Sequence, residues 1–245
     1  MSAEPKPARA MGWSRSASAW VTEQGAEGDW SRRHILFPIF RAFFARHRGK
    51  TALDIGCGEG QLVRLARADG IEASGLDVTP ALLERARNLD PQGCYREGRA
   101  EALPFANASF ELVLSCVALV DIPDIDRAIP EMARVLRPGG RMLVANTGSQ
   151  FSAGLPDGWR YDAAGQPQTF GIDHYLEPRE IVSEWRGISV LNHHRPLSAY
   201  LQRFLAAGLV LRAFDEPAAR SDRPEKDARH NRVPYFCVME WERPA

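Results

Sequence analysis

Short apolar runs alternate with helix-length amphipathic segments between Lys50 and Thr147, and this alternation limits the possible folds more than any other feature. The apolar runs predict strands, which in chain order cover residues 51–55, 73–78, 110–115 and 141–145. The segments between them carry apolar residues at helical spacing. Strands joined by helices need right-handed crossovers, which favour a mainly parallel sheet with helices on its faces. We therefore expect an α/β fold.

The charge balance and the cysteine pattern exclude several classes of partner. Lys plus Arg and Asp plus Glu number 31 each, so no basic stripe predicts nucleic-acid binding. The four cysteines form no CxxC pair, so we expect reduced thiols and no metal site. No apolar run approaches the roughly 20 residues that span a bilayer, and no secretory signal is recognisable. We expect a soluble, cytoplasmic monomer or homodimer with a small-molecule substrate.

The most informative segment is the run LDIGCGEG at residues 53–60, between a predicted strand and a predicted helix. Glycines at such a turn let a ligand approach the backbone closely. The loop reads GxGxG, whereas a dinucleotide loop reads GxGxxG, and it carries acids at Asp54 and Glu59. Acids there disfavour a pyrophosphate and favour a cationic ligand. Glu59 has a second interpretation, as a residue that stabilises the helix N-terminus.

Asp77 ends the next predicted strand, in the run GLDV. A carboxylate at this point is placed to accept hydrogen bonds from ribose hydroxyls. Ribose occurs in both NAD and adenosyl ligands, so Asp77 alone does not choose between them.

Four phrases carry a resemblance to a known family, in this order over residues 51–146: LDIGCGEG, GLDVTPALLERAR, GRAEALPFANASFELVLS and EMARVLRPGGRMLV. With them the chain resembles class I S-adenosylmethionine-dependent methyltransferases, in the type 11 branch that acts on small molecules. The resemblance implies a Rossmann-like three-layer fold. Its seven-stranded sheet would be mainly parallel, with an antiparallel C-terminal strand. An N-terminal helical cap and a lid insertion would be added to this fold. It also implies S-adenosylmethionine as cofactor and S-adenosylhomocysteine as product.

The resemblance also implies which residues hold the cofactor. The methionine end would lie on the glycine loop and on the end of a neighbouring strand, at Asp54, Gly56, Cys57, Gly58 and Ser115. Asp77 would bind the ribose and Val78 would pack on the adenine. The family usually has Asp before the Leu-Pro-Phe phrase, whereas this chain reads Arg99-Ala100-Glu101. We therefore expect altered adenine recognition, with Ala100 and Glu101 still at the ring.

The distribution of strand, helix and loop signals along the sequence predicts how the chain is organised. Residues 1–12 predict a disordered tail, and residues 13–245 a single domain. Within the domain we expect a helical cap over 13–49, a cofactor-binding core over 50–147, a lid or substrate insertion over 148–195, and the rest of the sheet over 196–245. Residues 221–232 are highly charged and predict an exposed loop.

Catalytic and substrate-binding candidates lie in the insertion and in the aromatic cap. A base is needed only if the nucleophile must lose a proton, and a histidine can accept one near neutral pH. The candidates for a base or for substrate orientation are His174, His193 and His194; their other interpretation is that they organise the loops. The candidates for substrate contact are Trp30, His34, Trp159, Tyr175 and Arg195. The cap aromatics have a second interpretation, as part of the core.

We expect methyl transfer to O, N or C of a small acceptor, aromatic or partly apolar, by in-line displacement. Two alternatives stay open from the sequence. An NAD-dependent oxidoreductase is disfavoured by GxGxG and by the acids in the loop. A non-catalytic adenosyl-binding module of the same fold would keep the cofactor site without turnover.

Overall fold

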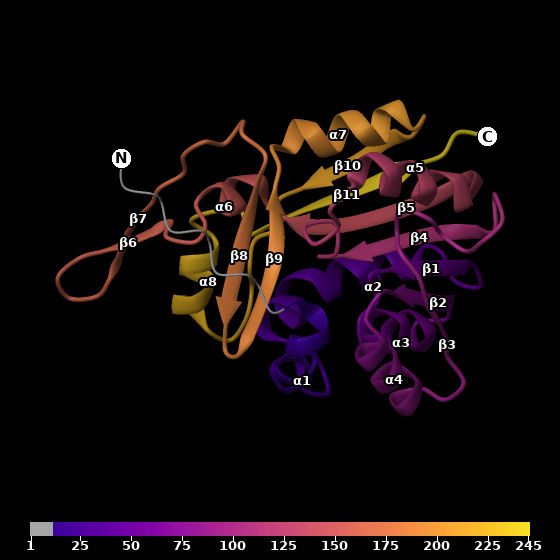
Figure 1. Cartoon of the computed structure of the whole chain (residues 1–245), viewed down its shortest axis with the longest axis horizontal. Coiled ribbons are helices and arrows are strands. Elements are labelled where there is room, and N and C mark those ends of the chain that lie inside the picture. The colour runs from indigo at the N-terminus through magenta and orange to yellow at the C-terminus, as the bar shows by residue number, and fades with distance from the viewer. Residues whose placement is uncertain (1–11) are drawn as a thin grey trace.

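The computed structural model describes residues 12–245, and its centre is a seven-stranded sheet (Figure 1). The predicted tail lies outside the described residues, apart from Gly12. The strands lie in the order β10-β11-β5-β4-β1-β2-β3. Their bounds are β1 (Thr51–Ile55), β2 (Glu72–Asp77), β3 (Cys94–Glu97), β4 (Phe110–Cys116), β5 (Leu136–Thr147), β10 (Val210–Asp215) and β11 (Phe236–Glu242).

The sheet is parallel from β3 to β5, and β11 runs antiparallel between β5 and β10. This confirms the predicted α/β fold with its antiparallel C-terminal strand. The parallel strands carry the apolar runs because helices cover both of their faces. Strand β3, with the sequence CYRE, was missing from the apolar runs because it is a short edge strand whose side chains are mostly exposed.

Helices make the two outer layers. One face is covered by η1, a turn of π-helix (Arg32–Leu36), with α2 (Phe37–Ala45), α3 (Gln61–Ala68) and α4 (Pro80–Leu89). The other face is covered by α5 (Ile125–Val135) and α7 (Leu197–Ala206). Each face of the sheet therefore buries its own apolar cluster. No helix among residues 12–245 is long and apolar enough to cross a membrane.

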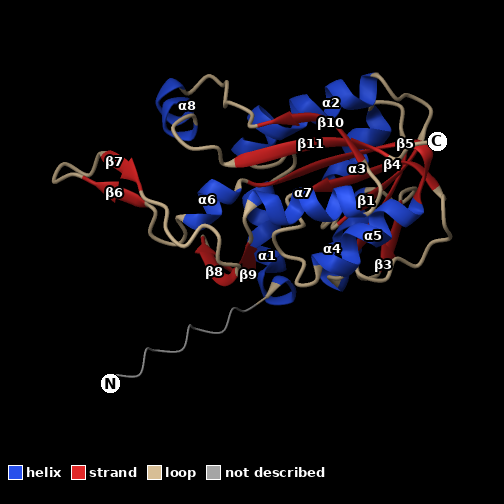
Figure 2. Cartoon of the chain, turned by 90° about the horizontal axis from the view of Figure 1, so that it is seen from above, coloured by secondary structure: helices blue, strands red, loops and turns tan. Residues whose placement is uncertain are grey.

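The remaining elements surround the carboxyl ends of the parallel strands or project beyond them. They are α1 (Trp13–Gln24), α6 (Ser149–Ala153), α8 (Pro224–His230), and two hairpins, β6 (Trp159–Tyr161) with β7 (Pro167–Phe170) and β8 (Arg179–Trp185) with β9 (Ile188–His194). The β6–β7 hairpin projects from one end of the molecule in both views (Figures 1 and 2). The β8–β9 hairpin lies beside α1 (Figure 1).

Helix α8 corrects the expectation of a loop over 221–232. Pro224 stands in its first turn, with acids at Glu225 and Asp227, and the last turn has Arg229 and His230. This order suits the helix dipole, with acids at the N-terminus and bases at the C-terminus. The charged residues of this segment therefore form a short helix, and none of its residues is buried.

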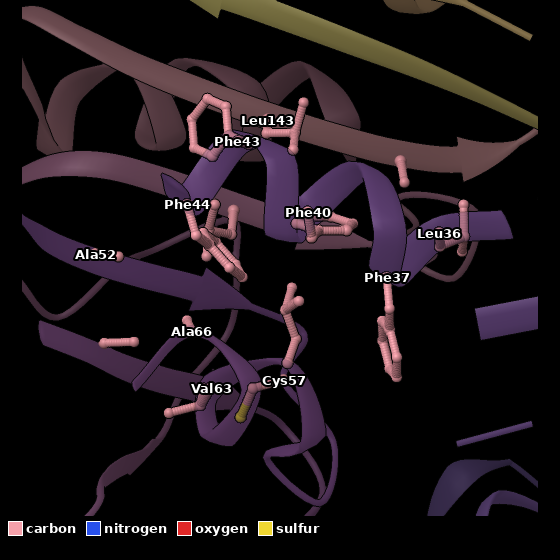
Figure 3. Packing of buried hydrophobic residues seen from close by; sticks show 14 of the residues in the cluster. Leu36, Phe37, Phe40, Phe43, Phe44, Ala52, Cys57, Val63, Ala66 and Leu143 are labelled. Carbon is pink, nitrogen blue, oxygen red and sulfur yellow. The ribbon is translucent and has the colours of Figure 1, made fainter. Parts of the chain in front are cut away.

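A phenylalanine cluster on α2 fixes the layer that holds the glycine loop. Phe40, Phe43 and Phe44 are fully or almost fully buried, and the rings of Phe40 and Phe44 have centroids 6.0 Å apart. Figure 3 shows Phe44 on the side of α2 that faces Ala52, and Phe43 on the side that faces Leu143.

Phe44→Ala is expected to lower the free energy of unfolding by about 3–5 kcal/mol, because it removes a fully buried ring from a close-packed layer. Urea denaturation followed by circular dichroism measures it. Phe44→Leu keeps most of the apolar volume and is the matched control, with an expected loss of about 1.5 kcal/mol or less. A loss below about 1 kcal/mol for the alanine variant would contradict the packing described.

Candidate functional site

A cavity of about 940 Å³ opens at the carboxyl ends of β1, β2, β4 and β5. One wall is made by the sheet and its loops, which contribute Gly56, Asp77, Cys116 and Thr147. The opposite wall comes from α1 and the loop after it, from the tip of the β8–β9 hairpin, and from the start of α8. The cavity therefore lies between the core of the fold and the elements outside it.

The glycine loop is held tightly beneath this cavity. The backbone N–H groups of Gly56 and Cys57 both donate to the carbonyl of Leu76, at 2.8 and 3.0 Å. Gly56 has φ +76°, and a Cβ there would stand 2.3 Å from the Cβ of Ala118. Glycine is required at position 56 because no side chain fits the conformation or the space.

Asp77 is anchored by the backbone and faces the cavity. Its Oδ2 accepts a hydrogen bond from the N–H of Gly58 at 2.8 Å, and its Oδ1 accepts one from the N–H of Thr79 at 2.8 Å. Burial raises the pKa of this carboxyl, and these hydrogen bonds oppose the rise. Each oxygen of a carboxylate has a second lone pair. Asp77 can therefore accept two further hydrogen bonds from a ligand such as a ribose.

Asp54 is buried below the same loop and does not itself line the cavity. Its Oδ1 has no hydrogen-bond partner among the described residues. Burial, and next the charge of Asp77, raise its pKa to about 8, while Arg32 lowers it. A buried carboxyl without a donor is costly. A ligand that brings a cation to this point would relieve that cost.

The cavity continues past Asp77 along a more apolar wall. Val78 is 53% exposed, a high value for a large apolar side chain, and it lines the cavity with Leu82. Ala100 and Glu101 line it too, and the predicted departure at Arg99 is visible as an ion pair of 2.8 Å to Glu101. A flat apolar group such as adenine fits against this wall.

Three residues of the glycine loop and of β4 for which the sequence suggested a contact with the cofactor do not line the cavity. Cys57 is buried, with its sulfur against Gly75, and burial raises the pKa of its thiol well above the usual value. Ser115 is fully buried and its hydroxyl has no partner among the described residues, whereas the next residue, Cys116, lines the cavity. Glu59 is buried outside the cavity and does not cap α3, whose N-cap is Gly60.

The cap contributes the indole of Trp30 and a cation that sequence reasoning did not single out. Arg32 lines the cavity, lies over the ring of Trp20 at 4.7 Å and pairs with Asp29. Burial has the largest single effect on the pKa of Arg32 and lowers it. The charge of Asp29 and the other interactions of Arg32 outweigh this effect, so the pKa is raised overall. Arg32 also lowers the pKa of Asp54, so its positive charge acts on the buried carboxyl below the glycine loop. That arrangement matches an amino acid zwitterion.

A second group of cations stands at the other end of the cavity. Arg186, Arg223 and Lys226 line it, and the Lys226 ammonium lies 4.2 Å over the ring of Trp30. The pKa of Lys226 is lowered, first by burial and then by Arg223 and Arg186. Trp30 is buried, and its indole N–H has no acceptor among the described residues. Arg186 is paired with Glu23, so Arg223 and Lys226 are the cations of this group that suit an anionic part of a ligand.

None of the three candidate histidines lines the cavity. His174 is exposed, with φ +50°, and its Nδ1 lies 3.0 Å from Glu177, which raises its pKa. His194 is buried, with Nδ1 at 2.8 Å from the hydroxyl of Ser152 and Nε2 at 2.9 Å from the carbonyl of Tyr175. His193 is half-buried, and burial lowers its pKa. The structure places these histidines in the framework of the insertion.

Four substrate candidates also lie outside the cavity lining, and each has its own contacts. His34 packs beside Trp30 at 5.5 Å between ring centroids. Trp159 donates from Nε1 to the hydroxyl of Tyr235 at 3.1 Å. The hydroxyl of Tyr175 accepts from the N–H of Leu197 at 3.2 Å. Arg195 is buried and donates to three carbonyls of one loop, those of Leu119, Ile122 and Pro123. Of the substrate candidates, Trp30 is the one at the cavity.

Helix α1 and the β8–β9 hairpin, which both contribute to the cavity wall, are joined by hydrogen bonds behind it. The hydroxyl of Ser16 donates to the carbonyl of Ser189 at 3.2 Å and accepts from its N–H at 3.1 Å. The N–H of Gly12 donates to the same carbonyl at 2.9 Å. Two segments 173 residues apart in the sequence thus meet beside the cavity. Among residues 12–245, no group of three or more His, Cys, Asp or Glu could hold a metal ion.

The sequence of this chain is similar to those of known methyltransferases. Residues 53–144 match a family model described as a methyltransferase domain. The chain is 30% identical over 155 residues to a malonyl-[acyl-carrier protein] O-methyltransferase of Erwinia billingiae, a match that covers 63% of this chain and 59% of the relative. An O-methyltransferase of Aspergillus sclerotiorum is 36% identical over 105 residues, 40% of each chain. The chain thus spans about 59% of the length of the malonyl relative.

A solved structure extends the similarity over most of the chain. The S-adenosylmethionine-dependent methyltransferase from Mesorhizobium loti has a TM-score of 0.75 and 28% sequence identity. The match covers 84% of this chain and 96% of that one.

Proposed function

Because the chain belongs to the type 11 branch of class I S-adenosylmethionine-dependent methyltransferases, we propose that it transfers a methyl group to a small molecule bound in the cavity. The observation that carries this proposal is Asp77. It is held by two backbone N–H groups at the end of β2, and it faces the cavity between the glycine loop and the exposed Val78.

The donor set fits S-adenosylmethionine from one end to the other. In our proposal Asp77 binds the ribose, and Val78 with Ala100 and Glu101 borders the adenine. The ammonium of the methionine end lies on the glycine loop, above the buried Asp54, and its carboxylate approaches Arg32. The cofactor supplies a methyl group on a sulfonium, which a nucleophile displaces in line. The protein contributes position and the exclusion of water.

The remaining part of the cavity is left for the acceptor. Trp13 and Trp30 supply apolar surface, and Arg223 and Lys226 supply positive charge. We propose an acceptor that is partly apolar and carries an anionic group. A thioester-linked carboxylic acid is one member of that class, favoured by the malonyl-[acyl-carrier protein] relatives.

The cofactor is tested by isothermal titration of the full chain with S-adenosylhomocysteine and, separately, with NADH. We expect micromolar or tighter binding of S-adenosylhomocysteine, about 8 kcal/mol or more, and none of NADH. Binding of NADH alone would contradict the proposal and support an oxidoreductase.

Turnover is tested with S-adenosylmethionine labelled in its methyl group. The acceptor panel contains malonyl-coenzyme A, aromatic carboxylates and phenols, each with a matched analogue that lacks the anionic group. Label should pass to the anionic members. Cofactor binding without transfer to any acceptor, including those in a cell extract, would support a non-catalytic module.

A further inference from the structure

Asp121 lies in the loop between β4 and α5 and lines the cavity. Its neighbour Asp124 has the role that sequence patterns suggest for both acids: it is the N-cap of α5, and it accepts a hydrogen bond from the N–H of Arg127 at 3.1 Å. Asp121 is not part of that cap. Its carboxyl is available to the cavity instead.

Two other elements hold the Asp121 carboxyl in place. Asn192 of β9 donates from Nδ2 to Oδ1 of Asp121 at 2.5 Å, and the side chain of Trp13 of α1 lowers the pKa of the same carboxyl. The loop itself is fixed, since the carbonyl of Val120 accepts from the N–H of His193 at 2.7 Å. The guanidinium of Arg195 binds the carbonyls on either side of it. The carboxyl therefore has a defined direction before any ligand binds.

The surroundings of Asp121 place it in the electrostatic neighbourhood of the cofactor residues. Burial raises its pKa to about 8, the hydrogen bonds from Asn192 and Trp13 lower it, Asp77 raises it and Arg32 lowers it. A neutral hydrogen-bond acceptor at position 121 could hold Asn192 and Trp13 equally well, and its burial would cost less free energy than the burial of a carboxylate.

We propose that Asp121 lies at the point of methyl transfer and accepts the proton of an O–H or N–H nucleophile of the substrate; a carboxylate nucleophile has no proton to lose and would not use it. This inference rests on the proposed function. As the acceptor's O or N forms a bond to the methyl carbon, the bond from that carbon to sulfur breaks and its electron pair stays on sulfur. The proton of the O–H or N–H passes to the Asp121 carboxylate and from there to water. Atoms and charge balance without a further reactant.

The geometry can be tested before any acceptor is known, with sinefungin as the probe. In sinefungin a carbon bearing an amine replaces the sulfonium and its methyl group, so an ammonium stands close to where the methyl group would be. A carboxylate at that point should hold the ammonium, and S-adenosylhomocysteine, which lacks it, serves as reference. The measured quantity is the ratio of the two dissociation constants, obtained by isothermal titration of the full chain at about pH 8.5.

Asp121→Asn is expected to reduce the preference for sinefungin about tenfold or more, because charge is lost with little change of shape. Asp124→Asn is the matched control, since Asn is also a good N-cap and position 124 does not line the cavity. Its ratio should equal that of the wild type. An unchanged ratio in Asp121→Asn, with both ligands bound, would overturn the proposal.

The wild-type chain gives an independent reading if Asp121→Asn fails to fold. Lowering the pH to about 6 protonates Asp121 and should reduce the preference for sinefungin, since the carboxyl loses its charge below its pKa. Asp54, Asp77 and Arg32 face parts of the ligand that both compounds share, so their effects cancel in the ratio. A ratio that stays flat from about pH 6 to 8.5 would overturn the proposal. Failure of both ligands to bind the wild type would instead contradict the proposed function.

Discussion

Asp77→Ala is expected to weaken binding of S-adenosylhomocysteine by about a hundredfold or more, because two charge-assisted hydrogen bonds to ribose hydroxyls are lost. The variant also removes the acceptor for the N–H groups of Gly58 and Thr79, which loosens the glycine loop. Isothermal titration measures the change, and circular dichroism checks the fold.

The matched control is Glu97→Ala. Glu97 is the register partner of Asp77 on the adjacent strand β3, yet it is exposed and lies outside the cavity lining. Its affinity should stay within about twofold of the wild type. If the two alanine variants bound the ligand equally well, Asp77 would have no part in holding it.

Affinity for S-adenosylhomocysteine should rise with pH up to about 8, by at most about tenfold per unit, and then level off. The reason is the Asp54 carboxyl, whose pKa burial and Asp77 raise to about 8. Below that pH the carboxyl is neutral, and it must lose its proton to pair with the ligand's ammonium. Isothermal titration between about pH 6 and 9 measures the slope. Asp54→Asn should abolish it, and Asp162→Asn, on the turn of the distant β6–β7 hairpin, should keep it.

The same carboxyl sets a pH dependence of stability in the free protein. Its folded pKa is above its unfolded value of 3.8, so the folded state holds the proton more tightly. Its contribution to stability is complete below 3.8 and is lost progressively as the pH rises through about 8. Asp121 acts in the same direction. Urea denaturation should show less of this loss in Asp54→Asn than in the wild type.

The parallel core was predictable because its signals are local. The runs 51–55 and 110–115 are mostly apolar, as is usual for strands covered on both faces, and they became β1 and β4. The GxGxG turn and the acid at the end of β2 follow from the same short segments. Their spacing is enough to bring Asp77 to the glycine loop, where the hydrogen bond from the N–H of Gly58 confirms the contact.

The opposite wall was not predictable in this way, because it is assembled from segments distant in sequence. Asp121 and Asp124 look alike as helix caps until Asn192 and Trp13 converge on the first of them. Arg195 suggests an anion site by its charge, yet the carbonyls around it use its donors. Lys226 belonged to a segment expected to be a loop, and its place above Trp30 depends on α8.

The junction between Ser16 and Ser189 has a consequence for exchange of ligands. Individual hydrogen bonds of this kind contribute about 1 kcal/mol each, a small part of the stability of a domain. Helix α1 and the β8–β9 hairpin are joined by these hydrogen bonds and by the exposed Glu23–Arg186 ion pair, so they can separate at lower cost than the sheet can open. This junction holds α1 and the β8–β9 hairpin together on one side of the cavity. The residues proposed to bind the adenosyl group belong to the sheet and its loops, which do not move when the junction opens. Entry and release become local events, and the core need not unfold for each turnover.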